Sequence, residues 1–452
     1  MRRLNVYVDR TLVGSLSEDN NLWVFEYAPA WAALDRGYDL SPALPRTTLR
    51  HADGGTRRPV QWFFDNLLPE ELLRRTVAEE AGIEDHEDAF ALLTYLGAES
   101  AGSLTLLPPD VASPDEFALS ELPDEALSKR IRNLPRQTLT KDAPKRMSVA
   151  GAQHKMLVVV KGAELFEPVG ATPSTWILKP DHPDADSYPA SAFNEFVTMR
   201  LARAARLTIP RVGIRYVPEP VYLVERFDRA VDGTSLLERD RLAAPAVGRL
   251  HIIDACQLLD KDRTFKHSGA TLDALARVVE RTTNKIATRT GLFRWLVFNI
   301  VVGNDDCHLK NISFFVRHDG IWLAPHYDLL CTGSYRTRAF AQERATWNHV
   351  PMAFALPGAR TFGEVTLEAV LAAARQLGLP DPAARRIVTE VTVRVAREFA
   401  AIVAEHEEVT RNAPPKRASC TGVEARLLKV IEHITLREML ERLRPAQDRA
   451  QG

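Results

Sequence analysis

The feature that most constrains the fold is a short polar segment enclosed between two apolar ones. Residues 291–302 are apolar on nearly every side, which predicts a buried helix. Residues 312–323 hold two apolar runs around the turn pair Asp319-Gly320, which predicts a β-hairpin. The nine residues between them, 303–311, carry Asp305, Asp306, His308, Lys310 and Asn311. Because polar side chains are costly beside buried elements, this segment indicates a functional site.

The spacing within this segment fits the chemistry of phosphoryl transfer. Asp306 and Asn311 are separated by four residues, and Asp328 follows seventeen residues after Asn311, beyond the hairpin. In kinases, residues with this spacing are a catalytic base, an amide that holds magnesium and a second metal-binding aspartate. We therefore predict Asp306 as the base and Asn311 and Asp328 as magnesium ligands. The alternative is a polar loop that caps a helix end, with Asp328 as a turn residue.

Residues upstream supply the other parts of an ATP site. Lys179 ends an otherwise apolar strand, and Glu195 lies sixteen residues later on the next helix, which is the pairing that positions ATP phosphates in kinases. Residues 148–155 form a small-residue loop whose backbone amides can approach phosphate. Residues 224–228 end a predicted strand pair at the place where a hinge between two lobes would lie, and backbone groups there could bind adenine. This order along the chain is typical of a two-lobed phosphotransferase.

The composition changes along the chain divide it into four segments. Residues 1–107 mix strands with a helix, and 108–147, rich in Pro, Asp, Glu, Ser and Lys, read as a connecting segment. Residues 148–245 are predicted to form a nucleotide-binding α/β lobe. Residues 246–452 are predicted to form a mainly helical lobe that carries the catalytic loop and the metal-binding aspartate. The fold class is therefore α+β.

Hydrophobic periodicity gives the expected elements. The predicted strands, apart from the hairpin, are 5–8, 103–107, 156–160, 175–178, 212–216 and 221–225. The predicted helices are 65–81, 191–206, 249–259, 272–281, 291–302, 366–377, 381–405 and 421–444. Thr421 with Glu424 and Thr435 with Glu438 have capping-box spacing, which suggests that the last stretch is two helices.

Charge and cysteine content exclude several classes of protein. The 452 residues carry a net charge of −1, which argues against a protein whose main role is to coat nucleic acid or anionic membrane. The four cysteines show no CxxC spacing and fit reduced thiols in a cytoplasmic protein. We find no signal peptide, and the longest apolar run, which includes Arg294, is too short to span a bilayer.

At these residues the chain resembles the HipA family, the serine/threonine kinase toxins of bacterial HipBA toxin–antitoxin modules. The similarity covers nearly the whole chain in the family's order. The matching stretches are Phe63-Phe-Asp-Asn-Leu-Leu-Pro69, Ser148-Val-Ala-Gly-Ala-Gln-His-Lys155, Ile177-Leu-Lys-Pro180, Asn194-Glu195, Val224-Glu-Arg-Phe-Asp228, Asn304-Asp-Asp-Cys-His-Leu-Lys-Asn311 and Pro325-His-Tyr-Asp328.

The resemblance implies a fold like that of protein and phosphoinositide kinases, with ATP and Mg²⁺ as cofactors. It implies Asp306 as catalytic base, Asn311 and Asp328 as metal ligands, and Glu195 as the partner that positions Lys179. The residues that it implies at the nucleotide are Ala150, Gly151, Ala152, Gln153, His154, Lys155, Lys179, Glu225, Arg226, Phe227, His308, Lys310, Asn311, Tyr327 and Asp328. Small departures from the family pattern are Asp305, Cys307 and His154, and they leave every expected polar role in place.

The resemblance also implies a regulated toxin. Ser148 matches the serine that family members autophosphorylate, and a phosphate there would compete with ATP. The implied substrate is a serine of a translation protein, an aminoacyl-tRNA synthetase. The implied partner is a HipB-type helix-turn-helix antitoxin that contacts the N-terminal segment, so DNA would be reached only through that partner.

Three other interpretations remain open from the residues alone. A small-molecule kinase would use the same base, amide and metal aspartate. A metal-dependent phosphohydrolase would use Asp305, Asp306, His308, His326 and Asp328, although it leaves Lys179 and Glu195 without a role. A pseudokinase corepressor would act only through its antitoxin, but the intact polar set argues against it.

Overall fold

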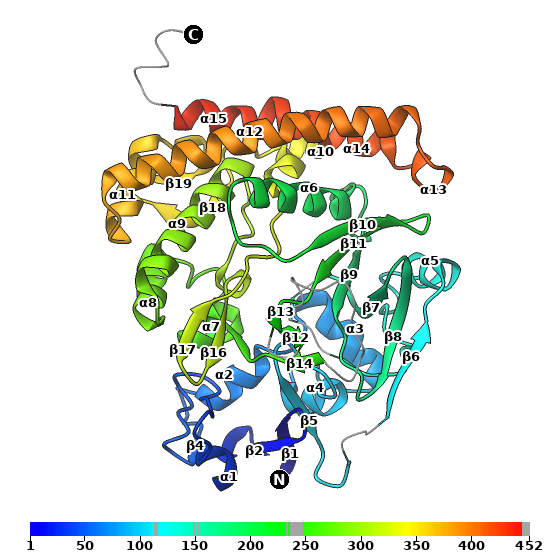
Figure 1. Ribbon diagram of the computed structural model, residues 1–452, viewed down its shortest axis with the longest axis vertical. Coiled ribbons are helices and arrows are strands. Elements are labelled where there is room, and N and C mark those ends of the chain that lie inside the picture. The colour runs from blue at the N-terminus through cyan, green and yellow to red at the C-terminus, as the bar shows by residue number, and fades with distance from the viewer. Residues whose placement is uncertain (113–115, 148–149, 152, 232–233, 236–246, 445–452) are drawn as a thin grey trace. The chain divides into compact units, whose positions relative to one another are not determined.

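The chain forms two compact units, each assembled from three stretches of sequence (Figure 1). Unit 1 comprises Met1–Lys179, Leu223–Phe265 and Ser313–Ala324, and unit 2 comprises Pro180–Tyr222, Lys266–Ile312 and Pro325–Gly452. The computed structural model describes residues 1–112, 116–147, 150–151, 153–231, 234–235 and 247–444. All four cysteines are free thiols, as predicted. Among the described residues, no helix is both long and apolar enough to cross a membrane.

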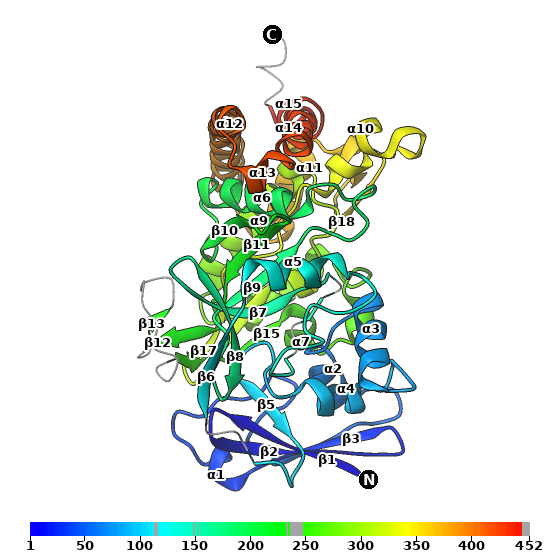
Figure 2. The same ribbon diagram turned by 90° about the vertical axis from the view of Figure 1, so that its right-hand side faces the viewer.

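The N-terminal part of unit 1 is an antiparallel sheet with helices packed on it (Figure 2). The strand order is β4-β3-β2-β1-β5, with β1 at Arg2–Val8, β2 at Thr11–Asp19, β3 at Leu22–Tyr27, β4 at Arg50–Ala52 and β5 at Leu104–Leu107. The helices are α1 at Pro29–Ala32, α2 at Pro59–Asp65, α3 at Glu71–Ala81 and α4 at Ala89–Leu96. Leu4, Val6 and Phe25 are fully buried on the face that α2 and α4 cover, because alternate residues of a strand point to the same side.

The strands predicted at 5–8 and 103–107 are confirmed, but the single helix predicted at 65–81 is wrong. The chain leaves α2 after Asp65 and starts α3 only at Glu71. Pro69 lies between the two, and proline disfavours helical geometry in the residue before it and removes a backbone donor. The buried side chains of Leu67 and Leu68 anchor this break.

The second sheet of unit 1 contains the strands that flank the predicted ATP loop. The strands of this sheet that belong wholly or partly to unit 1 are, in spatial order, β11 (Pro220–Glu225), β9 (Trp176–Pro180), β7 (Met156–Lys161), β8 (Glu164–Gly170) and β6 (Phe117–Glu121). Met156, Leu157 and Val158 of β7 are all buried, so both faces of this strand are covered. The segment expected only to connect two domains supplies β6 and the helix α5, Asp124–Arg132.

Two small sheets complete unit 1. One consists of β12 (Arg229–Val231), β13 (Thr234–Ser235) and β14 (Val247–Arg249), and the other of β15 (Ile252–Asp254), β16 (Ser313–Arg317) and β17 (Gly320–Leu323). The predicted hairpin at 312–323 is confirmed by the pairing of β16 with β17. The helix predicted at 249–259 is wrong. Its first part forms the end of β14 and the strand β15, and only α7, Ala255–Leu258, is helical.

Unit 2 is mainly helical. Its longer helices are α6 (Ser191–Ala204), α8 (Leu272–Arg281), α9 (Lys285–Val302), α11 (Leu367–Gln376), α12 (Asp381–Arg411), α14 (Thr421–Val430) and α15 (Arg437–Leu443). Its shorter elements include β10 (Val212–Tyr216), α10 (Arg338–Ala341), β18 (Pro351–Leu356), β19 (Ala359–Thr361) and α13 (Pro415–Ala418). The part of α9 predicted to be buried, residues 291–302, is buried on nearly all sides, and Phe293, Trp295 and Phe298 are fully enclosed, whereas the first turn of the helix is exposed. It packs against α8, α12 and α15.

The C-terminal stretch does not contain two separately capped helices. Helix α14 continues through a π-helical turn, Ile431–Leu436, into α15 without leaving helical geometry. Thr435 donates its hydroxyl to the Ile431 carbonyl at 3.2 Å, which is a bond inside a helix. The carboxylate of Glu424 is held by Tyr216, His406 and Arg417 instead of by a backbone amide. The predicted capping boxes are therefore wrong.

Candidate active site

The predicted catalytic loop of unit 2 is held by its own amides. Helix α9 ends at Gly303, which adopts a left-handed φ of 66°. Asn304 accepts the Asp306 backbone amide at 3.1 Å, and the Asn311 side-chain amide donates to the Asp306 carbonyl at 3.1 Å. Asn304 is fixed in turn by a 2.7 Å bond to Asn299 of α9. Asp306 therefore has its backbone clamped on both sides.

Asp306 is exposed although its neighbours are not. Every residue from Val301 to Phe314 is described, and Asp306 is the only exposed one among them, with 61% of its side chain accessible. Burial and the nearby carboxylates raise the pKa of Cys307, so this neighbour stays a neutral thiol. The loop therefore presents one carboxylate to solvent on a rigid backbone, which a general base requires.

The neighbouring Asp305 is engaged elsewhere. Its backbone amide donates to the Thr332 hydroxyl at 2.8 Å, and its carboxylate lies 3.6 Å from the Arg336 guanidinium. Only 14% of its side chain is accessible. The two adjacent aspartates thus have different environments, and Asp306 alone has the exposure expected of a base.

Asn311 and Asp328 offer the oxygen ligands that magnesium prefers. The side-chain nitrogen of Asn311 donates a hydrogen bond to the Asp306 carbonyl, so the side-chain oxygen of Asn311 is the atom that can bind a metal. Asp328 has a φ of 58°, in the left-handed region where aspartate is tolerated and functional residues are enriched. The Tyr327 hydroxyl donates to the Lys310 carbonyl at 2.7 Å and ties the two segments together.

Glu195 lies on α6, where it is almost fully buried. Burial, together with the negative charges of Glu195 and Asp328, raises the pKa of Tyr222 well above its ordinary value. The adjacent Asn194 exchanges two hydrogen bonds with the backbone of Cys331, at 2.9 and 3.1 Å. Helix α6 is thereby fixed to the segment that carries Asp328.

The predicted ATP loop belongs to unit 1 and is supported by the N-terminal segment. Gly151 forms a parallel bridge with Pro69, and its carbonyl accepts the Glu70 amide at 3.2 Å. The Lys155 ammonium donates to the Ala150 carbonyl at 2.5 Å and closes the loop on itself. Gly151 has a φ of 114°, which only glycine adopts readily. Ser148 and Ala152 lie outside the described residues.

The other predicted nucleotide residues of unit 1 line the ends of two strands. Lys179 is buried near the end of β9, and Glu225 is buried at the end of β11. The Phe227 ring meets Phe315 edge-on, at 6.0 Å between centroids. The Arg226 amide donates to the Thr175 carbonyl at 2.9 Å, which continues the pairing of these strands.

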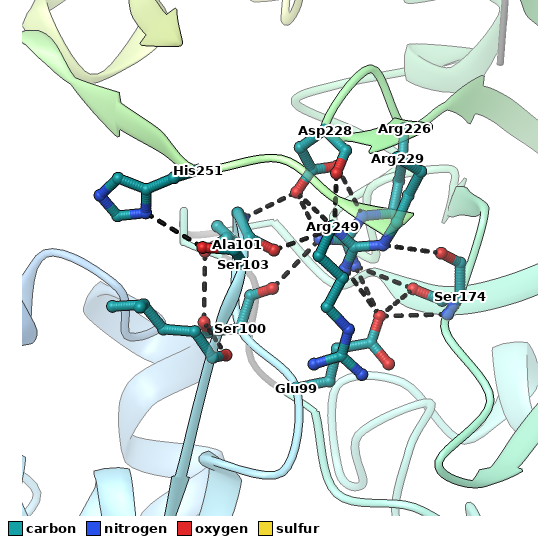
Figure 3. A network of polar contacts seen from close by, with 12 residues as sticks. Glu99, Ser100, Ala101, Ser103, Ser174, Arg226, Asp228, Arg229, Arg249 and His251 are labelled. Atoms are coloured by element: carbon teal, nitrogen blue, oxygen red, sulfur yellow. Dashed lines mark hydrogen bonds and ion pairs between the residues drawn. The ribbon is translucent and has the colours of Figure 1, made fainter. Parts of the chain in front are cut away.

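The side chain of Arg226 belongs to a buried charge cluster (Figure 3). It binds both carboxylate oxygens of Asp228, at 2.6 and 2.9 Å, and also contacts Glu99 at 3.1 Å. Glu99 accepts further bonds from Arg229 at 2.8 Å and Lys145 at 2.8 Å. Since the guanidinium is committed to this cluster, any contact of Arg226 with a nucleotide would come from its backbone. Sequence reasoning missed the cluster, because Glu99 and Arg226 are 127 residues apart.

The ligand set of a phosphohydrolase is not assembled. His326 is buried against Trp295, and burial lowers its pKa to about 4. Within the described residues, the group of three or more metal-ligating side chains is His267, Asp306 and His308, and it includes neither His326 nor Asp328. His267 was not predicted, because no spacing pattern connects it to the catalytic loop.

An α+β chain with an exposed loop aspartate, an asparagine five positions on and an aspartate beyond a hairpin has the arrangement of a kinase-like phosphotransferase. Comparison with known proteins gives the family. Residues 147–399 match the HipA-like C-terminal domain and residues 4–107 match the HipA N-terminal domain. The chain belongs to the HipA family, so the predicted resemblance is confirmed.

Individual relatives agree over most of the chain. Y4mE of Sinorhizobium fredii, which carries a provisional kinase name, is 32% identical over 90% of this chain and 94% of its own length. The serine/threonine-protein kinase toxin HipA of Shewanella oneidensis is 29% identical over 74% of this chain and 76% of its own. A solved structure of the Shewanella oneidensis MR-1 toxin–antitoxin complex of HipA, HipB and operator DNA aligns with a TM-score of 0.73 and 26% identity, over 95% of this chain and 97% of that one. The predicted kinase-like α+β fold class is confirmed.

Proposed function

We propose that the chain is a toxin serine/threonine protein kinase that transfers the γ-phosphate of ATP to a serine hydroxyl. The observation that carries this proposal is the single exposed carboxylate of Asp306 on a clamped, otherwise buried loop. Asp306 accepts the hydroxyl proton as the serine oxygen attacks the γ-phosphorus, and the bond to the departing ADP oxygen breaks. Relatives named as kinases support the same activity.

The remaining residues bind and position the reactants. Asn311 and Asp328 hold Mg²⁺, which neutralises charge on the phosphates. Lys179 contacts the phosphates and is positioned by Glu195. The loop from Ala150 to Lys155 covers the phosphates with backbone amides, as its small residues permit. The other nucleotide contacts are Glu225, the backbone of Arg226, Phe227, His308, Lys310 and Tyr327.

Regulation and partners complete the proposal. Autophosphorylation of Ser148, next to the ATP loop, switches the kinase off, because the added phosphate repels the nucleotide. A HipB-type antitoxin binds the chain through residues 1–107 and brings it to DNA, and the HipA–HipB–DNA complex of the Shewanella homologue supports such a partner. The substrate is an aminoacyl-tRNA synthetase in the cytoplasm, whose phosphorylation arrests translation.

The test is phosphorylation of the purified chain with magnesium and γ-labelled ATP, followed by peptide mass mapping. Removal of a general base costs about 10²- to 10⁴-fold in rate, so Asp306→Asn should lose nearly all labelling. Asp305→Asn is the matched control, since that neighbouring carboxylate is paired with Arg336. The labelling rate of this variant should stay within about tenfold of the wild-type rate. Label confined to Ser148 and absent from Ser148→Ala supports autophosphorylation. Equal labelling of wild type and Asp306→Asn would refute Asp306 as the base.

A further inference from the structure

Two histidines converge on the exposed carboxylate of the catalytic loop. A ring nitrogen of His267, a carboxylate oxygen of Asp306 and a ring nitrogen of His308 all lie within 4.8 Å of one another. The His267 Nε2 and the Asp306 Oδ1 are 3.9 Å apart, and the two imidazole rings meet edge to face with centroids 4.7 Å apart. All three residues belong to unit 2, so the cluster lies within one compact body.

The backbone holds these three side chains in place. The Leu309 amide donates to the Lys266 carbonyl at 3.2 Å, which joins the turn carrying His267 to the catalytic loop. The His308 amide donates to the Asp306 carbonyl at 3.0 Å, and the Ala270 amide closes the His267 turn by donating to the His267 carbonyl at 2.9 Å. A metal site built on such fixed segments loses little conformational entropy when it binds its ion.

We propose that His267, Asp306 and His308 form a binding site for a transition-metal ion of the zinc type. Two imidazoles and one carboxylate are a donor set that zinc uses in proteins, with the fourth position left to water or substrate. Ligand atoms of one tetrahedral zinc ion are about 3.4 Å apart, because each lies about 2.1 Å from the metal. The observed 3.9 Å between His267 and Asp306 needs only a small side-chain rotation to reach this value.

The donor set separates this site from the magnesium site of the proposed kinase. Magnesium takes oxygen ligands in octahedral geometry, whereas imidazole suits zinc, copper and nickel. Exposure supports access as well, since the side chains of His267 and Asp306 are 52% and 61% accessible while His308 forms the buried floor. An ion can therefore enter from solvent without unfolding the loop.

The consequence for activity rests on the proposed function. A metal ion on Asp306 takes the carboxylate lone pair that would accept the serine proton, so the bound ion inhibits phosphoryl transfer. The site thereby makes the kinase sensitive to free zinc. Release of the ion restores the base, since no covalent bond is broken.

Binding is tested without ATP, on the metal-free full-length chain, by calorimetric titration of Zn²⁺ and by the visible absorption of bound Co²⁺. Wild type should bind one ion at this site, and excess Mg²⁺ should not displace it. His267→Gln should weaken zinc binding at least about 100-fold, because even outer-sphere partners of a metal are worth about 10- to 100-fold. His433→Gln is the matched control, an exposed histidine 3.6 Å from the Glu432 carboxylate, and it should bind as wild type does.

Two results would overturn the site. One is that wild type takes up no zinc in the micromolar range, and the other is that wild type and His267→Gln bind zinc with equal affinity while circular dichroism shows both to be folded.

Inhibition is measured separately. Free zinc is set by a chelator buffer, and the labelling rate of each variant is compared with its own rate without zinc. Zinc should stop labelling in wild type and spare His267→Gln. Zinc that binds through His267 but leaves labelling unchanged would refute the inhibitory role. If wild type shows no labelling even without zinc, the proposed kinase fails, and calorimetry still decides the site.

Discussion

Three acidic residues of this chain show how the surroundings of a carboxylate decide what it does. Asp306 is exposed on a clamped loop, and we propose that it accepts a proton. Asp305, one residue away, is paired with Arg336 and has 14% of its side chain accessible. Glu99 is fully enclosed and holds cations together. The sequence shows three similar side chains, and only the structure separates the exposed Asp306, the half-buried Asp305 paired with Arg336 and the enclosed Glu99.

The buried carboxylate of Glu99 gives the first prediction. Replacing Glu99 with Gln removes the charge that compensates Lys145, Arg226 and Arg229, so the unfolding free energy of unit 1 should fall by about 3–5 kcal/mol. Urea unfolding monitored by fluorescence measures this. The control is Glu441→Gln, which removes an exposed helical pair with Arg437 and should cost under about 0.5 kcal/mol. Equal midpoints for both variants would show that the cluster contributes little.

The same residue sets a pH dependence. The charges of Lys145 and Arg229 outweigh the effect of burial and hold the pKa of Glu99 well below the ordinary value of 4.5. A depressed acid pKa adds stability that is complete above the unfolded pKa and is lost as pH falls through the folded one. The difference in midpoint between wild type and Glu99→Gln should therefore be constant from neutral pH down to about 4.5 and shrink only in stronger acid. A difference that already narrows between pH 7 and 6 would contradict this.

The same cluster marks the limit of sequence reasoning about individual residues. The roles that we propose for Asp306, Asn311 and Asp328 come from their spacing, because a loop of this kind is a local pattern. Arg226 was predicted beside the nucleotide from its position in a motif, while its guanidinium proved to be committed to Glu99 and Asp228. His267 was missed for a similar reason, since contacts between distant parts of the chain leave no periodic signal.

At the scale of elements, local patterns were reliable where packing agreed with them. The buried part of α9, residues 291–302, and the β16–β17 hairpin form as predicted, since the first is apolar on nearly every side and the second has a turn pair between apolar runs. The helix predicted at 249–259 fails because Ile252–Asp254 pairs with β16, far along the sequence. Long-range strand pairing thus overrides helical periodicity over a short stretch.

The loop that we propose to bind ATP gives a prediction at this scale. Gly151 has a φ of 114°, a backbone conformation that L side chains rarely adopt, and an added Cβ would also displace the Lys155 ammonium 2.6 Å away. Gly151→Ala should therefore strain the loop and weaken ATP binding about tenfold or more, since 1.4 kcal/mol is a factor of ten. Gly162→Ala is the matched control, with a φ of 60° and open space around its Cβ. Calorimetry with ATP–Mg²⁺ compares the two, and equal affinities would show that the Gly151 geometry does not matter for the nucleotide.

At the scale of the whole molecule, the N-terminal segment is part of unit 1 and is not a separate appendage. Ser103 bonds to His251 at 3.2 Å, and the other ring nitrogen of His251 meets the Leu40 carbonyl at 2.8 Å. Burial lowers the pKa of His251 to about 4, so this bridge is neutral and insensitive to pH near neutrality. The Gln257 amide donates to the Phe63 carbonyl at 2.8 Å and adds a second link. The antitoxin-binding role that we propose for residues 1–107 is therefore combined with a structural one.

This arrangement predicts what truncation does. A variant lacking residues 1–107 loses Glu99, so among the described residues Asp228 is the remaining charged partner of the buried Arg226 and Arg229. It also loses the Pro69–Glu70 support of the proposed ATP loop. Burying charge without compensation costs several kcal/mol, enough to exhaust the stability of a typical domain. The truncated chain should show no cooperative thermal unfolding and no ATP binding. Residues 1–107 supplied as a separate polypeptide should restore both, because the lost contacts are noncovalent. A truncated chain that unfolds cooperatively and binds ATP like the full chain would show that the cluster and the loop support are dispensable.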